Sequence, residues 1–151
     1  DEETILDIGN IMMEGRFSDY AAVHVVTTSS LDRLAEIDPE CSYDARRFRP
    51  NLVIDTSAIG NGFIENDWVG KILSIGVDVR LHISDPTPRC VIPTLVKKGG
   101  VAKEPKILRT IVKHNSQSVP LLDDEILPCI GVYGFVLQGG EINKGDFIHV
   151  E

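Results

Sequence analysis

The residue of this chain whose neighbours best suit it to do chemistry is Cys90. It follows Arg89, and three prolines within eight residues, at positions 86, 88 and 93, surround it. Proline fixes its own φ and lacks an amide donor, so this segment is expected to be stiff and non-helical. An adjacent guanidinium favours the thiolate, the form of cysteine that binds metals or attacks electrophiles. The pattern indicates an activated thiolate at the end of a strand; the alternative is a small buried packing residue, as free cysteines often are.

The densest positive cluster lies between Asp44 and Pro50, where Arg46, Arg47 and Arg49 stand together. The formal net charge of the chain is −8, which argues against a nucleic-acid backbone or an anionic membrane surface as its main partner. An anionic ligand must therefore find a local basic cluster such as this one. The alternative interpretation is a solvated arginine-rich loop ahead of a strand.

Composition places the chain among globular proteins of one ordinary domain. Its 151 residues are 42% hydrophobic and 25% charged, and no apolar run approaches the length of a membrane span. The three cysteines, Cys41, Cys90 and Cys129, form neither a Cys-x-x-Cys pair nor a zinc-binding spacing with histidine. We therefore expect a reducing, cytoplasmic setting. Cys41 and Cys129 are expected to be structural or incidental, and none of the four scattered histidines is expected to bind metal.

Strands outnumber helices in the hydrophobic pattern. The clearest strand is 77–83, which alternates apolar and polar residues without a fault, with Val77, Val79, Leu81 and Ile83 facing a core. It leads directly into the Cys90 segment. No alternation of strands and helices typical of a parallel sheet is visible, so we predict a mainly β (α+β) fold, an antiparallel barrel or sandwich with two or so short helices. The expected elements are strands at 21–28, 51–55, 71–75, 77–83, 130–137 and 147–150, helices at 31–37 and 105–115, a turn at 65–70 that docks Trp68, and a polar surface loop at 116–125.

Eight short motifs follow one another in the order of a known family. They are Ser18-Asp19, Ser30-Leu31-Asp32-Arg33-Leu34, Arg47-Phe48-Arg49-Pro50-Asn51-Leu52-Val53, Glu65-x-x-Trp68, Ile75-Gly76, Arg89-Cys90 with Pro93-Thr94, Gly131-x-Tyr133 and Gly140-x-Ile142-x-x-Gly145-Asp146. In this order they resemble the molybdenum cofactor sulfurase C-terminal (MOSC) domain over nearly the whole chain. The pattern is most similar to the mitochondrial amidoxime reducing component and its bacterial counterparts.

The resemblance implies a MOSC-type β-barrel that binds the pterin molybdenum cofactor (molybdopterin). It implies that Cys90 is the catalytic residue, either as the thiolate ligand of molybdenum or as a persulfide sulfur carrier. The cofactor-binding residues that it implies are Arg47, Arg49, Asn51, Arg89 and Thr94. A thiolate suits molybdenum that already carries dithiolene sulfur, and arginine suits the phosphate of the pterin through two parallel N–H bonds. No signature for a pyridoxal phosphate lysine is present.

Three hypotheses for function follow. The first is a molybdenum-dependent oxidoreductase that reduces N-hydroxylated or similar substrates, with an electron-transfer protein as partner. The second is a sulfur-transfer module that works with a sulfurase, and the third is a non-enzymatic interaction domain. We expect one domain over 1–151 without the N-terminal β-domain that the amidoxime-reducing relatives carry. The chain also departs from those relatives at Pro88, where they have a serine.

Overall fold

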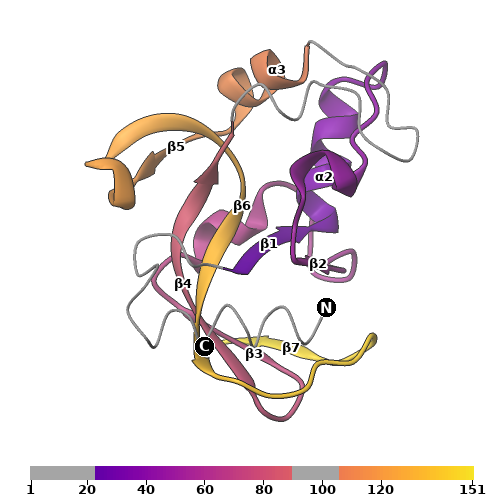
Figure 1. Ribbon diagram of the computed structural model, residues 1–151. Coiled ribbons are helices and arrows are strands. Elements are labelled where there is room, and N and C mark those ends of the chain that lie inside the picture. Colours follow the sequence, from indigo (N-terminus) through magenta and orange to yellow (C-terminus); the bar gives the residue numbers. More distant parts are fainter. Residues whose placement is uncertain (1–22, 90–105) are drawn as a thin grey trace.

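The computed structural model describes residues 23–89 and 106–151, and these form one curled sheet with helices packed at one end (Figure 1). The strand order is β2-β1-β6-β4-β3-β7, and β5 pairs with β6 off this path. Only β1 and β2 pair in parallel among the described strands, and the other pairs are antiparallel. The predicted mainly β fold with two short helices is therefore confirmed. The strands are β1 Val23–Thr27, β2 Leu52–Ile54, β3 Ile72–Ile75, β4 Val79–Pro88, β5 Ser116–Val119, β6 Glu125–Gln138 and β7 Ile148–Val150, and the helices are α2 Thr28–Ile37 and α3 Ile107–His114.

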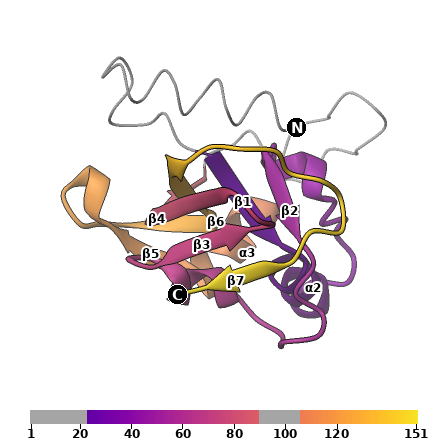
Figure 2. The ribbon, with the colours of Figure 1, turned by 90° about the horizontal axis from the view of Figure 1, so that it is seen from below.

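The two longest strands, β4 and β6, form the centre of the sheet and curl together across it (Figure 2). Their pairing shifts register between Ile83 and Asp85 and again between Pro86 and Pro88. Proline cannot donate to the ladder, which explains irregular pairing at this end of β4. The ladder nevertheless continues to the pair Pro88 and Cys129, so β4 delivers the next residue, Arg89, to the N-terminal part of β6, where its amide bonds the Pro128 carbonyl.

Two apolar clusters form the core. One fills the curl of the sheet and includes Leu73, Leu81 and Trp68, whose side chain is 6% exposed. The predicted docking of Trp68 is confirmed, and the residue lies in a 3-10 turn, η2, at Ile64–Trp68. The second cluster lies between the sheet and the helices, where Ile107 and Ile111 of α3 join Leu34, Phe48 and Ile130. This second cluster supports the surface at the end of β4.

Two details of the predicted elements are wrong. The segment 116–125 was expected to be a loop, but Ser116–Val119 form β5 against β6, with only Val119 buried. Such a polar edge strand lacks the apolar alternation by which a sequence reveals a strand. Val77 was expected to face the core, but it lies in the turn before β4 and is 97% exposed.

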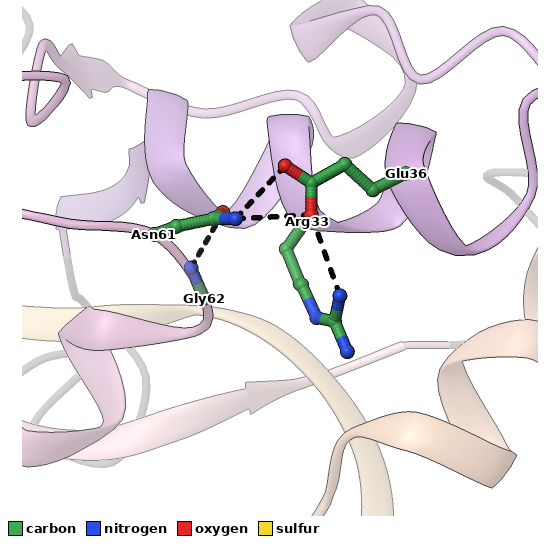
Figure 3. A network of polar contacts seen from close by, with 4 residues as sticks. All are labelled: Arg33, Glu36, Asn61 and Gly62. Carbon is green, nitrogen blue, oxygen red and sulfur yellow. Dashed lines mark hydrogen bonds and ion pairs between the residues drawn. The ribbon is translucent and has the colours of Figure 1, made fainter.

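A polar network attaches the glycine-rich loop at 60–62 to α2 (Figure 3). The Asn61 side-chain amide donates to both carboxylate oxygens of Glu36, at 2.8 and 3.0 Å, and its oxygen accepts from the Gly62 amide at 2.8 Å. Arg33 pairs with the same carboxylate at 3.3 Å. All of these side chains lie at the surface. Neither α2 nor α3 has the length and apolar character needed to cross a membrane.

Candidate functional site

The end of β4 brings Arg89 against two other segments of the chain. Its Nη1 lies 3.4 Å from Nε2 of His24 on β1 and 3.4 Å from the carbonyl oxygen of Phe48. The guanidinium carbon lies 5.7 Å from the centre of the Phe48 ring, within the range of a cation–π contact. The Arg89 amide donates to the Pro128 carbonyl at 2.8 Å, which fixes the backbone beside β6. We call His24, Phe48, Asn51, Arg89 and Gly131 the Arg89 corner.

His24 is held from the side of β2 by Asn51. The His24 amide donates to Oδ1 of Asn51 at 2.8 Å, and the Asn51 amide donates to the His24 carbonyl at 2.9 Å. The ring Nε2 also lies 3.2 Å from the Ile130 carbonyl. Burial, and then the positive charge of Arg89, lower the pKa of His24 to about 4, although contacts with backbone groups oppose the shift. His24 is therefore an uncharged imidazole at neutral pH.

Gly131 on β6 makes room for the His24 ring. Its φ is +81°, and a Cβ at this position would lie 2.6 Å from His24 Nε2 and 2.6 Å from the Val25 carbonyl oxygen. Both contacts are far shorter than van der Waals distance, and the backbone conformation disfavours any side chain. Only glycine fits here without displacing the imidazole or the strand.

The three clustered arginines are placed differently from one another. They flank or occupy a 3-10 turn, η1, at Ala45–Phe48. Arg46 pairs with Asp44 at 2.8 Å. Arg47 is fully buried, and its Nε donates to the Ser42 carbonyl at 2.5 Å. Arg49 is exposed in a left-handed backbone conformation, with φ of 50°, and makes no ion pair with any described residue.

The structure brings some of the site residues that were predicted from the sequence together, but not all of them. Arg89 and Asn51 lie together in the Arg89 corner, and Arg49 follows Phe48 of that corner in the chain. Arg47 points into the protein interior, so its assignment to the cofactor stays a prediction and its burial favours Arg49 and Arg89 over it. Cys90 and Thr94 lie outside the described residues.

Sequence reasoning missed His24, and it expected a close approach at Gly131 without selecting this glycine as a site residue. The sequence showed His24 only as one histidine in a β-rich run, and its contacts are with residues 27 to 106 positions away. The available signal was the glycine of Gly131-x-Tyr133, because a glycine inside a strand often marks the close approach of another group. Without a structure, nothing indicated that this group is the His24 imidazole.

The chemistry of the Arg89 corner fits an anionic ligand. The corner presents the cation Arg89, and the exposed Arg49 directly follows Phe48 in the chain. The buried Thr87 hydroxyl has no hydrogen-bond partner among the described residues. Buried hydroxyls are normally hydrogen-bonded, so that of Thr87 is a ready donor to a polar group. Within residues 23–89 and 106–151, no three of His, Cys, Asp and Glu converge as a metal site.

Cys129 is the described thiol nearest in the sheet to the end of β4. It lies opposite Pro88 and is fully buried. Burial raises its pKa to about 11, so the free thiol is protonated at neutral pH. The structural role expected for Cys129 agrees with this placement.

A second buried polar group lies at the other end of β1. Glu65 is fully buried, with Oε2 accepting from the Thr27 amide at 2.8 Å and Oε1 from the Ser30 hydroxyl. Thr27 Oγ1 in turn accepts from the Ser30 amide at 3.2 Å and caps α2. Burial raises the pKa of Glu65, and the bonds from Ser30 and Thr27 oppose the shift. We call Thr27, Ser30 and Glu65 the Glu65 cluster.

A cavity of about 1200 Å³ shares only Asn51 with the Arg89 corner. Residues 51–56 of one sheet edge and 142–148 near the other line it, together with Trp68 and Val150. Its walls are mainly apolar. Its described lining includes Lys144 but also Asp55 and Asp146, so it carries no net positive charge that would favour an anionic ligand.

Comparison with known proteins gives one family. The family model of the MOSC domain matches residues 13–149, which is nearly the whole chain. No curated protein matches it.

Proposed function

Because the chain belongs to the MOSC domain family, we propose that it binds the molybdenum cofactor at the Arg89 corner, with Cys90 as the metal ligand. MOSC domains are associated with this cofactor. The observation that carries the proposal is the position of Arg89, the residue that precedes Cys90 in the chain. Arg89 is held at the end of β4 against His24 and Phe48.

The arginines supply the charge that this protein as a whole lacks. The cofactor carries a phosphate, and a guanidinium binds phosphate oxygens through two parallel N–H bonds. Arg49 is exposed and Arg89 is partly exposed, so both are assigned to the anionic cofactor. Arg47 supports the turn that presents Arg49 by donating to the Ser42 carbonyl. Thr94 completes the proposed set.

The thiolate of Cys90 is assigned to the metal. Arg89 next to it in the chain favours the ionised thiol and offsets negative charge at the site. The bound cofactor would supply the redox chemistry, and the protein supplies binding, orientation and charge. We propose that the activity is that of a molybdenum-dependent oxidoreductase acting on N-hydroxylated substrates.

Metal analysis tests the proposal. The native chain and Cys90→Ser are produced in cells that make the cofactor, with Cys41→Ser as the matched control. Cys41 is buried, and its Sγ lies 3.1 Å from Asp38, a contact that a serine hydroxyl keeps. We expect molybdenum in the native chain and in Cys41→Ser, and at least a tenfold lower content in Cys90→Ser. Equal molybdenum in all three would overturn the assignment of Cys90.

Mass spectrometry separates the sulfur-carrier alternative. After incubation with a cysteine desulfurase and cysteine, a sulfur adduct on Cys90 in a chain that holds no molybdenum would replace the oxidoreductase with a sulfur-transfer role. A chain that holds molybdenum and takes up no sulfur would support the proposal.

A further inference from the structure

We propose that His24 is the positioning residue of this site, and that its ring holds the Arg89 guanidinium in place at the end of β4. This role of His24 deepens the proposed function and rests on it, because a guanidinium held in place has a role only if an anion binds to it. The positioning itself is a property of the chain alone and is measured without cofactor.

Three segments of the chain hold the His24 ring independently of Arg89. Asn51 bonds both the amide and the carbonyl of His24, at 2.8 and 2.9 Å, and so anchors this residue of β1. The Ile130 carbonyl lies 3.2 Å from Nε2 on the side of β6. Gly131 leaves the space that the ring fills, since a Cβ there would stand 2.6 Å from Nε2. The imidazole is thus held rigidly at the position where Arg89 meets it.

The Arg89 guanidinium contacts both Phe48 and His24. The Phe48 ring centre lies 5.7 Å from the guanidinium carbon, and the Phe48 carbonyl lies 3.4 Å from Nη1. Nε2 of His24 also lies 3.4 Å from Nη1. A free arginine side chain samples many rotamers, and fixing it costs conformational entropy. Holding the guanidinium in advance removes that cost from ligand binding.

The same geometry argues against a catalytic role for His24. Its side chain is largely buried, at 7% exposed for the residue, and Nε2 already lies against the Ile130 carbonyl and Arg89. With the proton of the neutral imidazole on Nδ1, the single lone pair of Nε2 accepts from Arg89 Nη1, and the Ile130 carbonyl is a neighbour of this nitrogen but not its hydrogen-bond acceptor. Nε2 therefore has no capacity left for a ligand. His24 therefore acts on a ligand through Arg89.

The first experiment observes Arg89 in the cofactor-free protein. The Nε–H signal of Arg89 in ¹H–¹⁵N spectra is assigned by its loss in Arg89→Lys. We expect a dispersed, slowly exchanging signal in the native chain and in His24→Gln, which keeps a polar group at this position. His24→Leu, similar in size and without hydrogen-bonding capacity, should move the signal to the averaged position of exposed arginines. The control is His149→Leu, which removes an exposed histidine of β7.

The second experiment measures retention of the cofactor. We expect His24→Leu to lose bound molybdenum about tenfold faster than the native chain on dialysis, since a hydrogen bond to a charged group is lost. His24→Gln should stay within about threefold of the native rate, and His149→Leu should be unchanged.

The outcomes separate the two proposals. A fixed Arg89 signal that depends on His24, in a chain that takes up no molybdenum, would support the positioning and overturn the proposed function. An unchanged signal and unchanged retention in His24→Leu would overturn the positioning and leave the proposed function intact. If His24→Leu does not fold, Gly131→Ala decides, because it keeps the imidazole and displaces it: an unmoved Arg89 signal there would overturn the positioning.

Discussion

The Arg89 corner and the Glu65 cluster lie at the two ends of one short strand, β1, and both bury an ionisable group. Glu65 is sealed from solvent, and each of its oxygens accepts a bond from the chain. In the Arg89 corner the histidine is buried, but the arginine that it contacts is partly exposed, and the exposed Arg49 lies next to Phe48 in the chain. A buried ionisable group alone therefore does not identify a ligand site. What distinguishes the Arg89 corner is that its buried histidine contacts an arginine that is partly exposed, and a ligand can therefore reach this cation.

The strongest test of this comparison is to remove the carboxylate of the Glu65 cluster. Glu65→Ala leaves the Thr27 amide and the Ser30 hydroxyl buried without an acceptor and opens a cavity, so the free energy of unfolding should fall by about 3–5 kcal/mol. Urea denaturation measures it. The matched control is Glu36→Ala on the exposed face of α2, where the loss of the contacts in Figure 3 should cost less than about 1 kcal/mol. Similar losses in both variants would contradict a structural role that is specific to Glu65.

The Arg89 corner should make the protein sensitive to acid. The pKa of His24 is about 4 in the folded protein, against an ordinary value of 6.5. Below pH 6.5 His24 takes up a proton in the unfolded chain but not in the folded chain. The free energy of unfolding therefore falls as the pH drops, by about 3 kcal/mol once the pH is below 4. Urea denaturation between pH 7 and pH 4 should show a smaller loss in His24→Gln than in the native chain, and His149→Gln should follow the native chain. A native-like acid loss in His24→Gln would show that other groups cause it.

Steric crowding at Gly131 gives the next effect. Gly131→Ala should lower the free energy of unfolding by about 3 kcal/mol, because left-handed strain adds to a Cβ that meets His24 and the Val25 carbonyl. Gly145→Ala is the control for strain alone, at about 1 kcal/mol, because its φ is +94° and nothing lies within 4 Å of its Cβ. Equal losses would mean that the ring moves aside at no cost.

The smallest effect concerns the sign of the pH dependence at Glu65. Burial raises the pKa of this carboxyl, so the folded chain keeps its proton to higher pH than the unfolded chain does. Its contribution is therefore present at low pH and is lost as the pH rises from the ordinary carboxyl value through the raised one. Relative to Glu65→Gln, the native chain should gain stability as the pH falls from 7 to 4.5. This slope is opposite in sign to that of His24, and a parallel slope would remove the contrast between the two groups.

The sequence predicted the fold class and most strands because the apolar patterns of the sheet are local. It also predicted that Trp68 is buried and that the segment around Pro86 and Pro88 is not helical, since proline restricts φ within the segment itself. It could not predict the Arg89 corner, which four segments of the chain build through contacts between distant residues. Nor could it tell that Arg47 is buried while Arg49, two residues later, is exposed. That difference arises in the short 3-10 turn η1 and in the left-handed backbone of Arg49.

The attachment of β1 at both ends has a consequence for local unfolding. Asn51 bonds the backbone at His24, and Glu65 bonds it at Thr27, in addition to the ladders with β2 and β6. A strand tied by side chains from outside its own ladders opens only when those ties also break. The amide hydrogens of Val25 and Val26 should therefore exchange with solvent among the slowest in the described chain, and a protease should reach β1 only through global unfolding.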